Sequence, residues 1–172
     1  MAWLVFWVKL LCRVVWGILK ATLLSVWFIP RMLFSCGRKT PDLSADVCLV
    51  TGAGQGLGRQ LALQLAECGA TLVLWDIDGE KVRAVAGEIR EGGREAYPYV
   101  VDISKKEDVY RVAAQVRDEV GDVAVLVNNA GIAHKKSYVS GGLTDEDILQ
   151  SFSVNTLAHF WVRQQGVIRM IG

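Results

Sequence analysis

Short apolar runs alternate with longer stretches of helical spacing from residue 44 onward. A short apolar run bounded by turn residues is typical of a buried strand, and apolar residues that recur every three or four positions are typical of a helix. Strands are predicted at Val47–Val50, Thr71–Trp75, Glu95–Val101 and Val123–Val127, and the first, second and fourth of these are expected to be buried. Helices are predicted between them at Gly56–Cys68, Glu80–Glu91 and Ser104–Val120. This alternation predicts a parallel sheet with right-handed crossovers.

A different pattern fills residues 1–30. Trp3–Ile29 is apolar and aromatic apart from Lys9, Arg13 and Lys20. These charges keep every uninterrupted apolar run below the roughly 18 residues of a simple spanning helix. On a helix the three charges lie within roughly 40° of one another, and such a basic stripe is typical of the membrane interface. We therefore predict a membrane-anchor helix that contacts lipid through residues 3–29.

The orientation of this anchor has two interpretations, a tilted spanning helix and an in-plane or hairpin anchor. A secretory signal is disfavoured, because no basic residue precedes the apolar core and no clear A-x-A site follows. Arg31, Arg38 and Lys39 follow the segment closely and predict that the globular part faces the cytosol. Residues 31–43 are expected to form a basic linker with Pro and Gly, followed by a globular domain at 44–161 and an atypical tail at 162–172.

Composition argues against several other classes of protein. The 172 residues are 52% hydrophobic with a mean hydropathy of +0.29, and the excess lies at the N-terminus, which supports an anchor rather than a larger core. The net charge of +1 argues against nucleic acid as a partner. The four cysteines show no C-x-x-C spacing and no histidine cluster, so neither a disulfide framework nor a metal site is expected.

The first predicted strand breaks into a glycine-rich loop just before the first predicted helix. The first N–H groups of a helix lack intrahelical partners, and the helix dipole presents its positive end there. Because glycine has no Cβ, a pyrophosphate can approach such a loop closely. The stretch therefore predicts a dinucleotide-binding loop, whose cofactor-binding residues are Thr51, Gly52, Gly54, Gln55, Gly56, Leu57 and Gly58.

Two acids follow predicted strands at positions suited to a nucleotide. Asp76 lies 18 residues after the last loop glycine, close to the roughly 20-residue offset at which an acid binds the adenosine ribose hydroxyls. A carboxylate there repels a 2′-phosphate and so favours NAD over NADP. The alternative to ribose binding is that Asp76 only starts a turn with Asp78. Asp102 follows the third strand and can reach an adenine edge, or can cap the next helix instead. Ile77 and Ile103, the next residues in each case, are included in the predicted cofactor site.

Two adjacent amides follow the fourth predicted strand, in the stretch Asn128-Asn129-Ala130-Gly131. In a doubly wound sheet this end of the strand faces the glycine loop across the point where the strand order reverses. The amides can bond neighbouring backbone and hold the loop against the cofactor. Asn129, Ala130 and Gly131 are therefore candidate binding residues.

A further helix is predicted after a polar loop. Thr144 and Asp147 form a capping-box pattern at its start, and Asn155 lies within the stretch that follows. His134 and His159 stand alone in the sequence, and a surface role is expected for both rather than ligation of a metal.

Together these motifs resemble the short-chain dehydrogenase/reductase fingerprint. The family's order is matched by Thr51-Gly52-x-x-x-Gly56-x-Gly58, Asp76, Asp102, Asn128–Gly131 and Val154-Asn155. The apolar N-terminus, Val73–Ile77 and Leu157–Trp161 are similar to the family's membrane-bound retinol-dehydrogenase and 17β-hydroxysteroid-dehydrogenase-like branch. The resemblance covers roughly residues 47–161. It implies an α/β fold with a Rossmann-type doubly wound parallel sheet, incomplete at about four strands and preceded by the apolar anchor helix.

The resemblance also implies a chemistry. In that family the glycine loop cradles the pyrophosphate, the acid after strand two selects NAD, the acid after strand three contacts adenine, and the Asn-Asn-Ala-Gly stretch packs beside the nicotinamide ribose. Asn155 matches the family's catalytic Asn, which supports a proton-relay water. The implied reaction is hydride transfer between NAD and a lipophilic alcohol or ketone, such as retinol or a steroid. The implied location is the membrane of the endoplasmic reticulum or of lipid droplets, and a homo-oligomer is left open.

The family's proton-transfer residues are missing from this sequence. Its chemistry needs a Ser and a Tyr-x-x-x-Lys pair, in which Lys lowers the pKa of Tyr so that it acts near neutral pH. The residues four positions after the four tyrosines (97, 99, 110 and 138) are Val101, Ile103, Ala114 and Gly142. We therefore expect a C-terminally truncated form that is itself inactive. The alternative is a membrane-tethered module that binds NAD or dimerises without catalysis.

Overall fold

The structure is a computed structural model that describes residues 41–134 and 142–164. The predicted membrane anchor lies outside the described residues, as do most of the predicted linker and the end of the predicted tail. Within the two described ranges, no helix combines the length and the apolar character needed to cross a membrane.

Strands and helices alternate as the sequence predicts. The strands are β1 (Val47–Thr51), β2 (Thr71–Asp76), β3 (Ala96–Val100) and β4 (Val125–Val127). The helices between them are α2 (Gly56–Glu67), α3 (Gly79–Glu91) and α4 (Lys106–Glu119). After β4 come α5 (Asp145–Phe152), a π-helical turn η2 (Ser153–Leu157) and α6 (Ala158–Gln164). The bounds of the strands and of the first three helices lie within two residues of the predicted ones.

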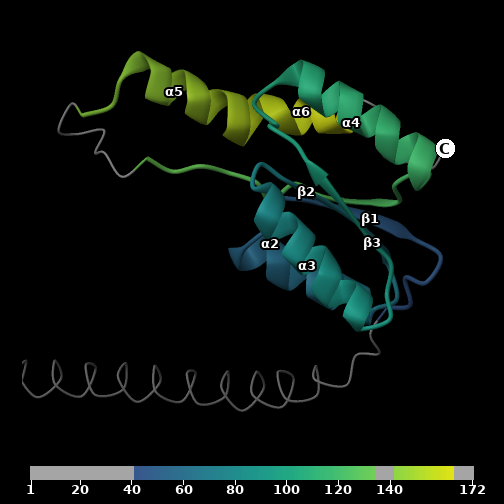
Figure 1. The fold of residues 1–172 in the computed structure, drawn as a ribbon. Coiled ribbons are helices and arrows are strands. Elements are labelled where there is room, and N and C mark those ends of the chain that lie inside the picture. Colours follow the sequence, from purple (N-terminus) through teal and green to yellow (C-terminus); the bar gives the residue numbers. More distant parts are fainter. Residues whose placement is uncertain (1–40, 135–141, 165–172) are drawn as a thin grey trace, which may run out of the picture. The chain divides into compact units, whose positions relative to one another are not determined.

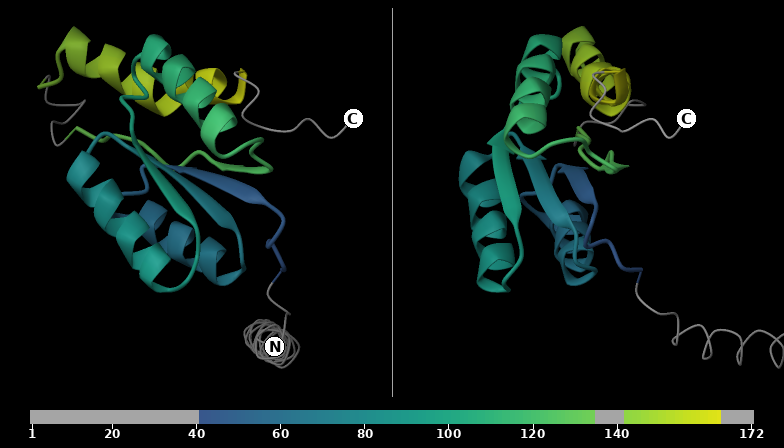
Figure 2. Two further views of the ribbon diagram at one scale, coloured as in Figure 1. Left: turned by 45° about the vertical axis from the view of Figure 1, so that its right-hand side comes forward. Right: turned by 90° about the vertical axis from the view of Figure 1, so that its right-hand side faces the viewer.

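All neighbouring strands run parallel in the order β3-β2-β1-β4, with β1 and β2 at the centre. Figures 1 and 2 show α2 and α3 on one face of the sheet and α4 and α6 on the other. Because successive side chains on a strand point to opposite faces, Cys48 and Val50 pack with α2 and α3, whereas Leu49 packs with α4 and α6. The expected Rossmann-type α/β fold with four parallel strands is therefore confirmed for the described residues.

The fourth strand is shorter and less buried than the sequence predicts. It covers only Val125–Val127, and all three residues are half-buried. β4 pairs with β1 on one side, and among residues 41–134 and 142–164 no strand pairs with its other edge. An apolar run indicates burial only if neighbouring elements cover it, and β4 has fewer such neighbours than β1. Val123, two residues before the strand, is the fully buried position.

The final helical region contains a feature that the sequence pattern does not predict. The capping box at its start is confirmed, because the Thr144 hydroxyl accepts from the Asp147 N–H and the Asp147 carboxylate accepts from the Thr144 N–H. The helix then loosens into the π-helical turn η2 before it continues as α6. Such turns are rare and frequently lie at functional sites, and Asn155 lies in this one.

Candidate functional site

A cleft of about 410 Å³ lies at the carboxyl ends of the strands. This is the edge of a doubly wound sheet at which ligands bind, and the volume lies within the range of about 300–1,000 Å³ typical of small-molecule sites. The predicted site residues that line it are Gly52, Gln55, Asp76, Ile77, Asp102, Ile103, Asn129, Ala130 and Gly131. The predicted residues that do not line it are Thr51, Gly54, Gly56, Leu57, Gly58 and Asn155. The folded chain thus brings together loops that follow all four strands.

The glycines of the loop after β1 have different structural roles. Gly52 has a left-handed φ of 66°, and a Cβ there would lie 2.8 Å from the Ala130 Cα. A Cβ on Gly58 would lie 2.1 Å from the Gly52 carbonyl oxygen, so α2 begins in direct contact with the loop. Gly56 also has a positive φ, 57°, but no atom lies within 4 Å of the position of its missing Cβ. Gly58 is therefore required by packing, Gly56 by its backbone conformation beside open space, and Gly52 by both packing and conformation.

The N-terminus of α2 is suited to an anionic group. Its N-cap residue, Gln55, makes no side-chain hydrogen bond to the first turn, and the first turn contains no acidic residue. The unpaired N–H groups and the positive end of the helix dipole are therefore not neutralised by the helix itself. Together with the glycine loop, this end of α2 meets the requirements of a diphosphate site.

Asp76, at the end of β2, holds the glycine loop with one oxygen and the following turn with the other. Its Oδ2 accepts from the Gly54 N–H at 2.8 Å, and its Oδ1 accepts from the Asp78 N–H at 2.9 Å. A Cβ on Gly54 would lie 2.9 Å from Oδ2, so the absence of a side chain at Gly54 makes room for this contact. Asp76 therefore does start a turn with Asp78, as the alternative states, whereas the claim that this is its only role stays a hypothesis. The turn does not exclude the ribose contact, because each carboxylate oxygen has a second lone pair and Asp76 lines the cleft.

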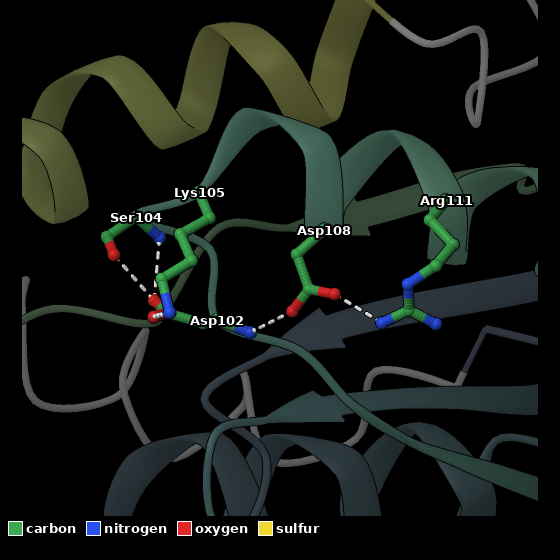
Figure 3. A network of polar contacts seen from close by, with 5 residues as sticks. All are labelled: Asp102, Ser104, Lys105, Asp108 and Arg111. Atoms are coloured by element: carbon green, nitrogen blue, oxygen red, sulfur yellow. Dashed lines mark hydrogen bonds and ion pairs between the residues drawn. The ribbon is translucent and has the colours of Figure 1, made fainter.

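Asp102 also lines the cleft, and its carboxylate is held by residues of its own loop (Figure 3). Oδ1 accepts from the Ser104 N–H at 3.1 Å and from the Ser104 hydroxyl at 2.6 Å, and Lys105 Nζ lies 3.1 Å from Oδ2. Partial burial raises the pKa of Asp102, but these bonds outweigh it and hold the pKa below its usual value. The alternative that Asp102 caps the next helix is wrong, because the N-cap of α4 is Lys105.

Thr51 and Asn129 join the ends of β1 and β4. The Thr51 side chain is buried, and its hydroxyl oxygen accepts from the backbone N–H groups of Asn129 and Ala130, both at 3.1 Å. The hydroxyl donates to the Val127 carbonyl oxygen at 3.4 Å. In return, the Asn129 amide donates to the carbonyl oxygens of Thr51 at 3.0 Å and Gly52 at 3.2 Å. The prediction that the Asn-Asn stretch holds the glycine loop is therefore confirmed for Asn129.

Asn155 fixes the segment that follows Gly131. Its Oδ1 accepts from the Ile132 N–H and its Nδ2 donates to the Ile132 carbonyl oxygen, both at 2.9 Å. Oδ1 also lies 3.3 Å from the position of a Cβ on Gly131. Asn155 thus positions one wall of the cleft from η2, while the role in a proton relay that the resemblance implies stays a prediction.

His134 is less exposed than the expected surface role implies. Its side chain is only 18% exposed, and its Nδ1 lies 3.5 Å from Asp147 Oδ1. Its Nε2 has no hydrogen-bond partner among the described residues. The reason is the fold, since the chain after β4 passes beside the capping box of α5. His159 on α6 is likewise only half-exposed.

Several residues that line the cleft were not among the predicted site residues. Trp75 is fully buried next to Asp76, and its indole N–H has no partner in the described part of the chain. Gln150 and Val154 reach the cleft from α5 and η2. Val154 belongs to the Val154-Asn155 stretch that carries the resemblance, and Gln150 lies five residues before Asn155 on a predicted helix. Neither observation specifies which face of the helix the side chain occupies.

Comparison with known proteins gives consistent matches. A family model described as "short chain dehydrogenase" matches residues 46–172. Estradiol 17-beta-dehydrogenase 11 of Mus musculus is 40% identical over 134 residues, which cover 78% of this chain and 42% of that protein. Epidermal retinol dehydrogenase 2 of Homo sapiens is 46% identical over 131 residues, which cover 76% of this chain and 42% of that protein. The chain thus spans less than half the length of these two relatives.

Solved structures show the same similarity. A metagenomic short-chain oxidoreductase in complex with NADP matches with a TM-score of 0.67 and 33% identity, over 72% of this chain and 56% of the other. An NAD⁺-bound xylitol dehydrogenase matches with a TM-score of 0.67 and 32% identity, over 75% of this chain and 48% of the other.

Proposed function

Because the chain belongs to the short-chain dehydrogenase family, we propose that its cleft binds NAD and that the whole protein transfers hydride between NAD and a lipophilic alcohol or ketone. The observation that carries the proposal is the cleft at the carboxyl ends of the strands, bounded by the glycine loop, Asp76 and Asp102. The retinol and estradiol dehydrogenases among the relatives support a retinoid or steroid as the substrate class.

Each part of NAD has a counterpart among the described residues. The open side of the glycine loop at Gly56 and the uncapped start of α2 suit the pyrophosphate. Asp76 accepts from the adenosine ribose hydroxyls and Asp102 from the adenine edge. The stretch from Asn129 to Gly131, which is hydrogen-bonded to Thr51 at the end of β1, forms the wall beside the nicotinamide ribose. When bound, NAD accepts or delivers the hydride.

We further propose that these 172 residues bind NAD without turning over a substrate. No tyrosine of the sequence has a lysine four positions later, so the family's acid/base pair is absent. Tyr99 does not replace it, because burial and its hydrogen bond to Glu119, at 2.7 Å, raise the pKa of the phenol above its usual value. A phenol with a raised pKa is a poor acid/base group near neutral pH.

The test of the cofactor is a titration of the full chain, in detergent micelles, with NAD and with NADP. We expect saturable binding of NAD and binding of NADP at least about tenfold weaker, because the Asp76 carboxylate repels the 2′-phosphate. Asp76→Asn should reduce the difference in affinity between NAD and NADP. Asp122→Asn is the matched control, because it changes an exposed acid just before β4, at the amino end of the sheet, and it should leave the difference unchanged. Absence of saturable NAD binding by a chain that unfolds cooperatively would contradict the proposal.

The test of catalysis uses the same preparation. We expect no NAD-dependent oxidation of retinol or of a steroid alcohol above a heated control. Activity above that control would show that these residues supply the proton transfer themselves. Bound NAD without activity is also what a tethered binding or dimerising module predicts, and sedimentation with and without NAD tests its dimerising form.

We also propose that residues 3–29 hold the chain at the cytosolic face of the endoplasmic reticulum or of lipid droplets. The apolar and aromatic composition and the basic stripe of this segment support the proposal. Flotation of the chain with anionic vesicles tests it, with reversal of the charges at Lys9, Arg13 and Lys20 as the variant. The matched control reverses three exposed arginines of the globular part, Arg90, Arg94 and Arg117. Equal loss of flotation in both would count against a specific role of the stripe.

A further inference from the structure

Asp102 is held at its carboxylate and also at its backbone. The side chain is bonded by Ser104 and Lys105, as described above. Its own backbone N–H donates to Asp108 Oδ2 at 2.8 Å, across the first turn of α4 (Figure 3). The loop between β3 and α4 is thus anchored from within and also from the helix that follows it.

Asp108 is well placed to fix this backbone. Its side chain is 25% exposed, and its second oxygen pairs with Arg111, one turn further along α4. Partial burial raises the pKa of Asp108, but the bonds from the Asp102 N–H and Arg111 outweigh it and keep the pKa below its usual value. The group is therefore an ionised acceptor near neutral pH, and its partner on α4 restrains its rotamer.

Asp108 lies outside the cleft, although the loop that it holds lines it. Asp102, Ile103 and Ser104 line the cleft, whereas Asp108 and Arg111 do not. The bond from the Asp102 N–H is the contact that connects Asp108 to a residue of the cleft. The carboxylates of Asp102 in the loop and Asp108 on α4 also repel each other, so this arrangement has an electrostatic cost that the bonds to Ser104, Lys105 and Arg111 offset.

We propose that Asp108, held by Arg111, is a positioning residue that orients Asp102 for recognition of the amino group of a bound adenine. This inference rests on the proposed binding of NAD. If the Asp102 backbone is released, the carboxylate can turn away from the base, while the glycine loop and Asp76 still hold the rest of the nucleotide. Loss of Asp108 should therefore reduce discrimination between bases more than it reduces affinity for dinucleotides in general.

The experiment titrates the full chain with NAD and with nicotinamide hypoxanthine dinucleotide, whose base carries an oxygen in place of the amino group. The wild type should prefer NAD by about tenfold or more, since a hydrogen bond to a charged group is lost with the analogue. Asp108→Ala should reduce this preference by at least about threefold, and Asp108→Asn, which keeps an acceptor oxygen, should largely retain it. Asp118→Ala, an exposed acid near the other end of α4, is the matched control and should leave the preference unchanged.

A double variant separates positioning from simple destabilisation. If Asp108 acts through Asp102, the Asp102→Ala variant and the Asp102→Ala/Asp108→Ala variant should show the same low preference, because the two effects are coupled. An Asp108→Ala chain that binds both nucleotides more weakly by the same factor would overturn the proposal. If that variant does not fold, the exposed Arg111→Ala variant decides, and an unchanged preference in it overturns the proposal.

The outcomes for the wild type separate this inference from the proposed function. A wild-type chain that binds neither nucleotide contradicts NAD binding itself. A wild-type chain that binds both nucleotides equally overturns the inference about Asp108 and leaves NAD binding standing.

Discussion

The contact between α2 and the glycine loop gives the sharpest prediction for stability. Gly58→Ala adds a single methyl group in the first turn of α2, at 2.1 Å from the Gly52 carbonyl oxygen and 2.5 Å from the Asn129 amide nitrogen. To restore an ordinary contact of 3.4 Å, the helix and the loop must separate by about 1.3 Å. That movement stretches the bonds from the Asn129 amide to the Thr51 and Gly52 carbonyl oxygens, which are 3.0 and 3.2 Å long.

The expected magnitude follows from these contacts. Overpacking costs about 1–3 kcal/mol, and each of the two hydrogen bonds contributes about 0.5–1.5 kcal/mol. Glycine in a helix is also about 0.5–1 kcal/mol less stable than alanine, so part of the loss is offset. Gly87→Ala is the matched control, because Gly87 also lies in a helix, α3, and no atom lies within 4 Å of the position of its missing Cβ. The difference between the two variants isolates the contact, at about 2–6 kcal/mol.

Urea and thermal unfolding followed by circular dichroism measure this difference. For a chain of this size, about 2–4 °C in Tm corresponds to 1 kcal/mol, so Gly58→Ala should melt at least about 4 °C below Gly87→Ala. Gly87→Ala itself should melt at or slightly above the wild type. A Gly58→Ala chain as stable as Gly87→Ala would refute the assignment of Gly58 to close packing between helix and loop.

Three further predictions concern the groups around the cleft. Thr51→Val should cost about 1–3 kcal/mol in urea unfolding, because the N–H groups of Asn129 and Ala130 lose their acceptor, and Thr51→Ser should retain most of the stability. Asn155→Ala should cost about 1–2 kcal/mol through its two bonds to Ile132, while Asn155→Asp, which keeps only the acceptor, should be intermediate, and equal stability of all three chains would contradict that role. Because the pKa of Asp102 is lowered in the folded state, its contribution to stability is present above its unfolded pKa and is lost as the pH falls through the folded pKa. The stability difference between the wild type and Asp102→Asn should therefore be constant above about pH 5 and shrink below about pH 4, and a pH-independent difference would contradict it.

The sequence predicts the alternation of strands and helices because each element carries a local signal. Apolar runs at β1 and β2 are long enough to be buried on both faces, and the glycine loop, Gly69 and Gly121 mark where elements end. The positions of Asp76 and Asp102 at strand ends follow from the same pattern. Since parallel strands place their carboxyl ends at one edge, the approximate location of the cleft is also predictable from the sequence.

The sequence does not predict which atoms each of these residues contacts. The length and half-buried state of β4 depend on which strands pair beside it, and the half-buried position of His134 depends on where the chain after β4 passes α5. Both depend on neighbours far away in the chain, and a local pattern contains no information about them.

The amino-acid sequence by itself thus determined the strand–helix alternation, the glycine loop and the acids that follow the strands. Only the tertiary structure decided that Gly54 makes room for Asp76, that Gly58 makes room for Gly52, and that Asp108 holds the backbone of Asp102. The physical reason is that propensity and periodicity act over a few neighbouring residues, whereas hydrogen bonds between loops require the sheet to bring distant strand ends within about 3 Å of one another.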